Sequence, residues 1–497
     1  MMSSTGRFPA AELPPDPIPQ KFRRGVRVVV AAQIGSQLVT VVVLSVLYRQ
    51  LGPGPYGLLG MVMPLLLLLR IGIAGGLDVA SVQQDQLSDQ QASVLFWFNQ
   101  VLGAAMILAA VALAPALAWF YRAAAVVPLT IALSGTSLPL ALSTQHQALL
   151  QRRLRLGTLA LIRLAAQIGG GIAAIATALA HGGVWALVVQ QYVEVILVAL
   201  AAWWAEPWRP QWMLRRAGIR PLVRFGGYYT LSSLMFYLTT NVDKILIGRF
   251  LKEDALGLYS QAFNLMMKPV NVVIAPLTGV MLPALSRAAG DPQRYVELLL
   301  GFFRWIALVM FPIGVGLIIV ADDAMQVLGG SRWSGAGPLL AALGGSVLVQ
   351  GFFNVLGSVL ASVGRAKHLF YASAAIAATL AAAFCVGLWV GMWAGAPTLG
   401  VAASYSVAMV VLVFPPYMAL CLRAVGASLR AWLAQLLPAA LAAAGMGLAV
   451  AACHALLAPH GAVPVLARLA AEIAVGVMVY AILAWREIRW FLRLGRT

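Results

Sequence analysis

The sequence predicts an all-α polytopic membrane protein with about 14 transmembrane helices, and composition and segment length carry this prediction. Of the 497 residues, 61% are apolar and only 10% are charged. A soluble domain is nearer half apolar and a quarter charged, so lipid must cover most of this apolar surface. The apolar residues also gather into segments long enough to cross a bilayer as helices.

A window of about 19 residues divides the chain into successive candidate spans. The predicted spans are 27–47, 58–77, 92–121, 126–144, 158–180, 184–205, 226–248, 256–281, 298–320, 338–360, 369–393, 398–420, 432–457 and 465–485. The first span follows the basic stretch "KFRRGVR" and is too long for a signal-peptide core, so we expect it to stay uncleaved.

The basic residues predict the orientation of the chain. Most of the 34 Lys and Arg residues fall in alternate connections and in the two tails, as expected where positive charge stays inside. This distribution predicts that both termini are cytoplasmic and accounts for the net charge of +18 without nucleic acid. The acidic connection at 78–91 departs from the trend.

The chain repeats itself at a shift of 200 residues. Thr40, Arg49 and Gly57 meet Thr240, Arg249 and Gly257, without gaps. Both copies enter the membrane from the same side, which indicates a parallel repeat of two pseudo-symmetric six-helix lobes plus two extra helices. The predicted regions are a Pro-rich cytoplasmic tail (1–26), an N-lobe (27–205), a cytoplasmic linker (206–225), a C-lobe (226–420) and a last pair of helices with a basic tail (421–497).

Several kinds of chemistry are absent from the sequence. No G-x-x-x-x-G-K-[ST] motif occurs, so ATP is not expected as the direct energy source. The three cysteines lie far apart in apolar runs, without histidines at metal-ligand spacing. These missing motifs predict no cofactor and no metal. Every loop is too short for a soluble domain, so we expect no enzyme activity and place the function within the membrane.

Polar residues form stripes along two equivalent spans. Gln33, Gln37 and Thr40 share one face of the first span, and Tyr237 and Thr240 occupy shifted positions in the seventh. Such stripes can line a water-filled cavity, or they can join neighbouring helices by hydrogen bonds. Both interpretations remain open at this stage.

Lys268 is the clearest charge at membrane depth. A polar face continues through Gln261, Asn264 and Asn271, which favours a hydrated cavity over an ion pair with a carboxylate. Gln350 and Asn354 are further cavity candidates on the tenth span.

Arginines and one carboxylate complete the candidate site. Arg70, Arg163 and Arg304 lie in the cytoplasmic halves of their spans, where they either bind an anionic head group or extend to the interface. Glu194, in the middle of its span, either couples transport to an ion gradient or pairs with a cation.

Two closely spaced charge pairs have simpler interpretations. Asp243 and Lys244 are adjacent and cannot share a helix face, so we expect them to make separate contacts. Arg468 and Glu472 are four residues apart, so we expect a local ion pair.

Four segments resemble the polysaccharide-export branch of the multidrug/oligosaccharidyl-lipid/polysaccharide exporter superfamily, whose members are Wzx-type flippases. They are "VQQDQLSDQQASVLFWFN", "HQALLQRRLRLGTLALI", "GGVWALVVQQ" and "NVDKILIGRFLKEDALGLYSQAFNLM". The resemblance covers most of the chain and weakens in the last four spans. Two positions depart from the family pattern: Gln84 stands where an arginine is usual, and Leu156 where an aromatic residue is usual.

The resemblance implies a transporter of lipid-linked oligosaccharide in the bacterial inner membrane. Its lobes would alternately expose a central cationic cavity, with Lys268 and Arg70 at the pyrophosphate of an undecaprenyl carrier, an ion gradient as energy source, and polysaccharide polymerase and export proteins as possible partners. The alternatives are a multidrug cation antiporter of the same superfamily, a lipid II flippase and, from another class, a membrane glycan polymerase. Basic residues outnumber acidic ones within the spans, which favours an anionic cargo.

Overall fold

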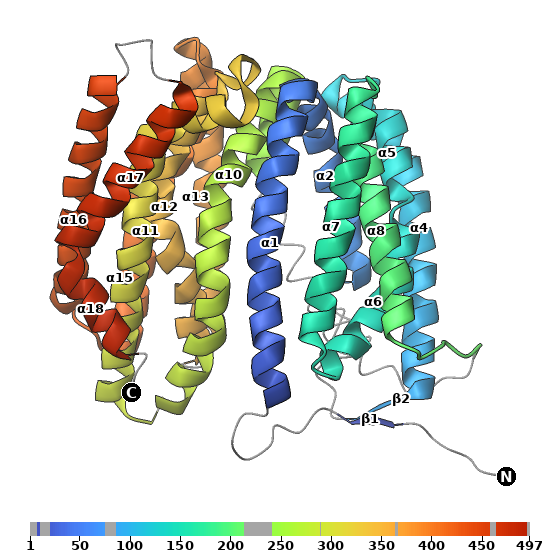
Figure 1. The fold of residues 1–497 in the computed structure, drawn as a ribbon, viewed down its shortest axis with the longest axis horizontal. Coiled ribbons are helices and arrows are strands. Elements are labelled where there is room, and N and C mark those ends of the chain that lie inside the picture. The colour runs from blue at the N-terminus through green and yellow to red at the C-terminus, as the bar shows by residue number, and fades with distance from the viewer. Residues whose placement is uncertain are drawn as a thin grey trace. The chain divides into compact units, whose positions relative to one another are not determined.

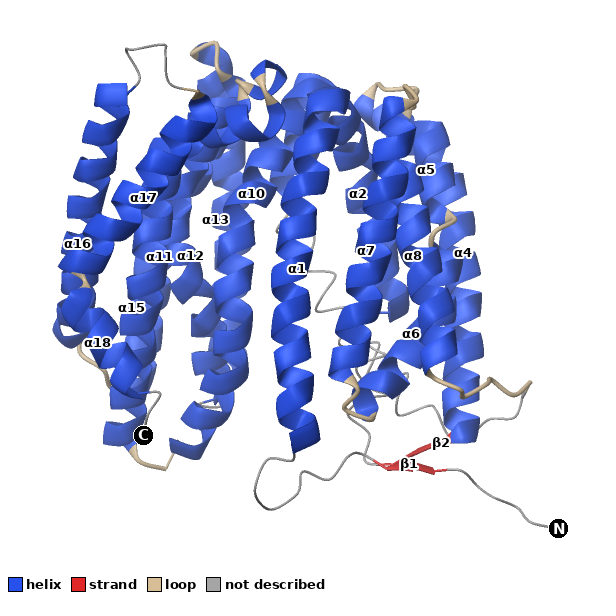
Figure 2. Ribbon diagram, viewed as in Figure 1, coloured by secondary structure: helices blue, strands red, loops and turns tan. Residues whose placement is uncertain are grey.

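The structure is a computed structural model, which describes residues 7–9, 20–74, 86–212, 241–288, 290–362, 366–457 and 464–494. Almost all of these residues are helical (Figure 2), as the sequence predicts. The described residues also include two three-residue strands, β1 (Arg7–Pro9) and β2 (Gln86–Ser88), which pair with each other in antiparallel orientation.

The chain forms two compact units. Unit 1 comprises Met1–Asn241 and Gly248–Leu256, and unit 2 comprises Val242–Ile247 and Gly257–Thr497. Most of the predicted linker 206–225 lies outside the described residues, so the lobe boundaries stay a prediction. The helices of unit 1 are α1 (Gln20–Leu51), α2 (Pro53–Ala74), α4 (Asp89–Tyr121), α5 (Val126–Ser134), α6 (Ser137–Arg152), α7 (Leu156–Leu179) and α8 (Trp185–Ala205).

Unit 2 contains most of the long helix α10 (Val242–Ala288), which is labelled in Figure 1. Its remaining helices are α11 (Pro292–Gly329), the 3-10 turn η1 (Ser331–Trp333), α12 (Ala336–Ser362), α13 (Ala366–Trp393), α14 (Pro397–Val407), the π-helix η2 (Ala408–Val413), α15 (Phe414–Val425), α16 (Leu429–Leu457), α17 (Val465–Leu483) and α18 (Trp485–Leu494).

The described part of the chain has 12 helical segments long and apolar enough to cross a membrane. Each matches one predicted span, and the short helices merge: α5 with α6, and α14 with η2 and α15. The predicted span 256–281 lies within α10, and most of the span 226–248 falls outside the described residues. The chain is therefore a multi-pass membrane protein, with about 14 spans as an approximate count.

The turns that join the first two spans of each copy of the repeat both contain a residue with a positive φ. Gly52, between α1 and α2, has a φ of 70°, and Lys252, 200 residues later, interrupts α10 with a φ of 69°. The break at Lys252 is the connection predicted between the seventh and eighth spans. Matching left-handed turns at matching positions support the parallel repeat.

Close helix packing in unit 1 depends on two adjacent glycines of α7. A Cβ at Gly170 would lie 2.4 Å from Cγ of Glu194 in α8, and one at Gly171 would lie 2.5 Å from Val43 in α1. Small residues let membrane helices approach closely where lipid removes the hydrophobic drive to associate. These glycines therefore let α7 pack against α1 on one side and α8 on the other.

Unit 2 is built around α12, most of which is buried. Phe352 of α12 packs against Phe303, Phe414 and Trp432 from three other helices. A second apolar cluster joins α16 and α17 to α11 through Leu308, Met446, Val450 and Tyr480, with α16 and α17 adjacent in Figure 1. The last two spans are thus part of unit 2.

Candidate functional site

The polar stripe of α1 is partly used to bind α7. Gln167 of α7 accepts a hydrogen bond from Ser36 Oγ at 2.6 Å, and its amide donates to Thr40 Oγ1 at 2.6 Å and to the Ser36 carbonyl at 3.1 Å. Thr40 therefore takes the structural alternative, a hydrogen bond between helices. Gln33 is exposed and Gln37 is half-buried on the same helix.

Two arginines of unit 1 carry their charge without a carboxylate among the described residues. Arg70 donates to Thr136 Oγ1 at the junction of α5 and α6, and its Nε is buried with no hydrogen-bond partner among these residues. Arg163 is exposed and donates to Gln147 Oε1 at 3.2 Å rather than meeting Gln167, with which it shares a helix face. Both guanidinium groups thus remain available to an anion.

Glu194 is half-buried where α8 packs against Gly170. Its Oε1 accepts a hydrogen bond of 3.1 Å from Gln190, one turn earlier on the same helix. No ion pair joins Glu194 to any cation in the described part of the chain. Of the two roles expected for it, pairing with a cation therefore has no support in this structure.

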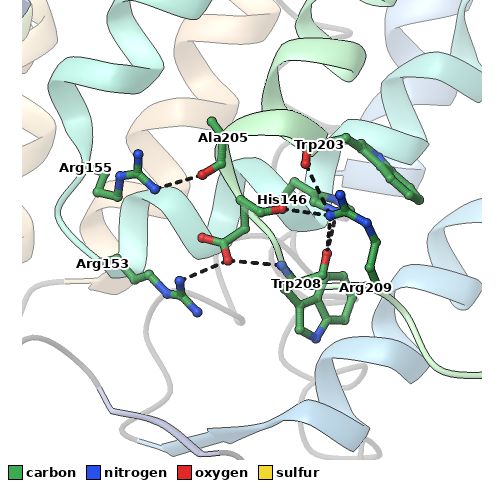
Figure 3. Close-up of polar contacts among 8 residues, drawn as sticks. His146, Arg153, Arg155, Trp203, Ala205, Trp208 and Arg209 are labelled. Atoms are coloured by element: carbon green, nitrogen blue, oxygen red, sulfur yellow. Dashed lines mark hydrogen bonds and ion pairs between the residues drawn. The ribbon is translucent and has the colours of Figure 1, made fainter.

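A cluster of polar and charged residues, which the sequence analysis did not identify, attaches the segment after α8 to the rest of unit 1 (Figure 3). Glu206 is fully buried and pairs with Arg153 at 3.0 Å. Arg209 donates to the carbonyls of Trp203, Glu206 and Trp208, and His146 Nε2 lies 3.2 Å from the Trp208 carbonyl. A single glutamate among the arginines of "QRRLRLG" and "EPWRP" is the signal that could have revealed it.

The arginines of this cluster are occupied. Arg155 donates to the Ala205 carbonyl at 2.8 Å, while Arg153 and Arg209 are held as described above. Each of these guanidinium groups is held through Nη1 by a backbone carbonyl or by the buried carboxylate. The cluster therefore positions the connection that follows α8.

Unit 2 contains a buried carboxylate network. Asp243 is only 1% exposed, and its Oδ2 accepts a hydrogen bond of 2.8 Å from the Tyr259 hydroxyl. Tyr405 donates to Gln350 Oε1 at 3.4 Å and contacts Phe263. The Lys244 ammonium lies 5.2 Å from the ring centroid of Phe263, and no ion pair of the described residues joins it to the Asp243 carboxylate.

Lys268 lies on a face of α10 that the described residues leave open. The lysine is half-buried, whereas Asn264 and Asn271, one turn to either side, are exposed. No hydrogen bond or ion pair joins Lys268 to another described residue. Gln261, two turns before Lys268 in α10, is buried. In α12, Asn354 is exposed and its side-chain amide donates to the Gln350 carbonyl at 2.9 Å.

Arg304 has a partner that its position in the sequence did not reveal. Its Nε donates to Glu487 of α18, and its guanidinium lies 4.2 Å from the ring centroid of Trp490. From the sequence we expect Arg304 either to bind a head group or to extend to the membrane interface. An ion pair with Glu487 is not among these alternatives. Arg304 therefore fastens α18 to α11.

One expected ion pair is wrong. Arg468 binds both carboxylate oxygens of Asp323 in α11, while Glu472 binds His454 Nδ1 at 2.8 Å. The i, i+4 spacing places Arg468 and Glu472 on one face, but partners on neighbouring helices compete successfully for both. Tyr237 and Thr240 lie outside the described residues.

A pocket of about 480 Å³ in unit 1 is lined by Trp119, Phe120, Arg122 and Arg249. None of the predicted site residues borders it. Arg249 lies 5.8 Å from the ring centroid of Phe120, so part of the lining is a cation–π contact.

The fold is similar to those of solved transporters. The lipid II flippase MurJ in an inward closed conformation superposes with a TM-score of 0.73 at 13% identity, covering 93% of this chain and 99% of that one. An inward-facing multidrug transporter of the MATE family, from the MOP superfamily, gives 0.62 at 13% identity over 78% of this chain and 95% of that one. At this identity the likeness establishes the fold.

Curated relatives lie closer in sequence. The teichuronic acid biosynthesis protein TuaB of Bacillus subtilis is 29% identical over 60% of this chain and 62% of its own length. The lipopolysaccharide biosynthesis protein WzxC of Escherichia coli is 23% identical, over 65% and 66%. The succinoglycan biosynthesis transport protein ExoT of Rhizobium meliloti is 26% identical, over 62% of each. The chain thus matches less than two thirds of the length of these relatives.

The family model described as "Polysaccharide biosynthesis protein" matches residues 46–338, more than half of the chain. This matched stretch includes the turns at Gly52 and Lys252 and the segments that carry Arg70, Glu194 and Lys268. The resemblance to polysaccharide exporters of the MOP superfamily is confirmed, and the chain belongs to the polysaccharide biosynthesis protein family.

Proposed function

We propose that this protein moves an oligosaccharide repeat unit, linked by pyrophosphate to undecaprenol, across the bacterial inner membrane. The exported units would serve exopolysaccharide or lipopolysaccharide O-antigen synthesis. Transport would proceed by alternating access of a cationic site to the two sides of the membrane. On this proposal the protein is a transporter rather than an enzyme, and both of its termini are cytoplasmic.

The observation that carries the proposal is Lys268, which lies in α10 within the span predicted at 256–281 and has no ion pair among the described residues. A lysine facing lipid would cost several kcal/mol, about 3 on insertion scales. The exposed amides of Asn264 and Asn271 beside it would be costly there too. This face therefore suits water and a polar cargo, and an ammonium group suits a pyrophosphate.

Unit 1 offers a second cationic position. Arg70 donates one hydrogen bond to Thr136, and its buried Nε has no hydrogen-bond partner among the described residues. A guanidinium can bind phosphate oxygens through two parallel hydrogen bonds. We assign Arg70, with Arg163 nearer the surface, a role in binding an anionic head group as well.

The sugar part would be bound by uncharged polar groups. Gln33, Gln37, Asn264, Asn271 and Asn354 are at least partly accessible in the structure. Their amides can both donate to and accept from sugar hydroxyls. Tyr237 and Thr240 keep the role expected from their positions in the repeat.

An ion gradient is the proposed energy source, and Glu194 is the proposed coupling group. A half-buried carboxylate without an ion pair among the described residues can take up and release a proton or a metal cation. A polysaccharide polymerase is the proposed downstream partner, since the flipped repeat unit must be joined to others.

The multidrug antiporter remains the main competitor. It would need acidic groups open to a cationic drug, yet Asp243 and Glu472 are buried in contacts with Tyr259 and His454. Of the three acidic residues within the predicted spans, Glu194 is the one that is not held in such a buried contact. The balance of available charge therefore favours an anionic cargo.

Proteoliposomes containing the purified protein test the proposal. A fluorescent undecaprenyl-pyrophosphate oligosaccharide is placed in both leaflets, and an impermeant quencher is added outside. We expect the protein to bring the inner-leaflet lipid to the quencher, which empty vesicles and vesicles with heat-inactivated protein do not do. Absence of this movement, with efflux of a small organic cation from the same vesicles, would assign the protein to drug antiport.

A further inference from the structure

Three helices of unit 2 bring a set of metal-ligand side chains together. Asp323 lies near the end of α11, His454 in the last turn of α16 and Glu472 in the second turn of α17. One ligand atom from each lies within 4.8 Å of the other two. None of these residues has a role in the transport proposed above.

Two of the three side chains of this cluster are buried, and the third is partly exposed. The side chains of Asp323 and Glu472 are 2% and 0% exposed, whereas that of His454 is 36% exposed. Beneath the cluster, Met446, Val450 and Tyr480 form part of the apolar core that joins the three helices. An ion could enter from the His454 side and would then meet an almost dry carboxylate pair.

A second observation points to a missing ligand. Glu472 Oε2 is buried and has no hydrogen-bond partner among the described residues. Leaving a charged oxygen unsatisfied in a buried site is costly, and buried carboxylates are normally paired or bound to a metal. Glu472 Oε1 already accepts from His454, so the second oxygen is the free position.

The charge balance also leaves room for a cation. Asp323 and Glu472 contribute two negative charges, and Arg468, bound to both oxygens of Asp323, contributes one positive charge. With a neutral imidazole the group keeps one net negative charge. Arg468 fills the role that hydrogen bonds to a ligating carboxylate usually have, which is to fix its orientation.

We propose that Asp323, His454 and Glu472 bind a divalent cation of the Zn²⁺ type. One imidazole and two carboxylates form a ligand set suited to zinc, with water in the fourth position. Zinc bonds of about 2.1 Å at tetrahedral angles separate ligand atoms by about 3.4 Å. The observed separations from His454 Nδ1 are 2.8 Å to Glu472 and 4.0 Å to Asp323, which lie on either side of that value.

The metal would fasten the last two spans to the rest of unit 2. Its ligands come from α11, α16 and α17, so one ion links three helices that otherwise meet through apolar contacts, the Arg468 pair, the His454–Glu472 contact and a hydrogen bond from the Tyr480 hydroxyl to the Leu308 carbonyl. On the orientation proposed above, these helix ends face the periplasm, where Zn²⁺ reaches them without crossing the membrane. The expected effect is greater resistance of unit 2 to unfolding.

Metal binding to the full-length protein in detergent tests the proposal. The protein carries a purification tag without histidine and is stripped with a chelator, given Zn²⁺ and passed over a desalting column. We expect about one Zn²⁺ per chain by elemental analysis and a melting temperature raised by about 2 °C or more. Mg²⁺ at the same concentration should do neither, because this site offers nitrogen as well as oxygen.

Matched variants locate the ion. His454→Gln and Glu472→Gln should lose the bound Zn²⁺, whereas His368→Gln and Asp322→Asn remove an exposed histidine and an exposed aspartate and should retain it. If a ligand variant does not fold, Co²⁺ bound to the unaltered protein should show the visible absorption of a four-coordinate nitrogen and oxygen site. Equal Zn²⁺ binding by all variants, or none by the unaltered protein, would overturn the proposal and leave a protonated His454 as the fourth charge.

Discussion

The polar stripes of α1 and α10 look alike in the sequence but have different surroundings in the structure. In α1, Thr40 and the neighbouring Ser36 are hydrogen-bonded to Gln167 of α7. In α10, Lys268 lies half-buried between two exposed asparagines and has no ion pair among the described residues. One stripe joins helices of unit 1, while the other is left open in unit 2.

This difference shows how a structural polar group can be told from a functional one in a membrane protein. Membrane helices use amides and hydroxyls routinely as interhelical contacts, each worth about 0.6 kcal/mol on average. An ammonium group at depth has no such inexpensive use. The partners of a polar residue, rather than its spacing, therefore decide which interpretation applies, and variants at five positions can break or sharpen the comparison.

Replacing the open lysine should have the largest effect. Lys268→Ala removes a charged contact to the proposed head group, for which about 1.5–3 kcal/mol is typical, so transport should fall about tenfold or more. Lys268→Arg keeps the charge and should retain part of the activity. The measurement is polymer export by a strain that depends on this protein, normalised to its amount in the membrane.

Substituting Gly57 should have the next largest effect, this time on folding. A Cβ there would lie 1.7 Å from the carbonyl oxygen of Glu253, so Gly57→Ala must displace backbone. Overpacking of this kind costs about 1–3 kcal/mol or more. We expect much less folded protein by size-exclusion chromatography.

Gly54→Ala is the control for that variant. Its Cβ would lie 2.8 Å from a side-chain oxygen of Asp254, which is exposed and can rotate away. Near-normal yield of Gly54→Ala beside poor yield of Gly57→Ala would support backbone contact as the cause. Equal yields would contradict it.

Breaking the closed stripe should affect stability rather than transport. Gln167→Leu removes three hydrogen bonds to α1, and a loss of about 2 kcal/mol is expected from membrane averages. The melting temperature in detergent should fall, while the transport rate per folded molecule stays near normal. A normal melting temperature with a strong loss of transport would instead place Gln167 in the cargo site.

The smallest expected effect is a gain in stability. Lys252 has a φ of 69° and a ψ of −175°, a region that only glycine occupies without strain. Lys252→Gly should relieve that strain and stabilise the fold by about 1 kcal/mol after the entropic cost of glycine. A rise in melting temperature with unchanged transport would confirm that the turn, like Gly52, is structural.

The sequence predicted the spans well because hydropathy and length are local properties. The repeat was visible too, and its turn at Lys252 matches that at Gly52. What the sequence could not reveal were partners on distant segments. Arg304 pairs with Glu487, 183 residues away, and Arg468 prefers Asp323 to the nearby Glu472. Spacing determines which residues share a helix face, but the packing of the helices determines which residue forms the ion pair.

The same limit applies to the candidate site. Periodicity placed Thr40 and Lys268 on polar faces, but only the structure separated a face packed on α7 from one left open. For Glu206 the sequence offered only its place among arginines, because its partner Arg153 lies 53 positions earlier and its burial depends on tertiary packing.

Ligand binding by the Lys268 variants tests the central claim most directly. The affinities of the purified protein for undecaprenyl pyrophosphate and for uncharged undecaprenol are compared, and Lys252→Gly serves as a control that also removes one positive charge from α10. The account predicts that the unaltered protein and Lys252→Gly prefer the pyrophosphate about tenfold or more, and that Lys268→Ala loses this preference. If Lys268→Ala keeps the preference, then the open lysine does not recognise the head group, and the proposed site is wrong.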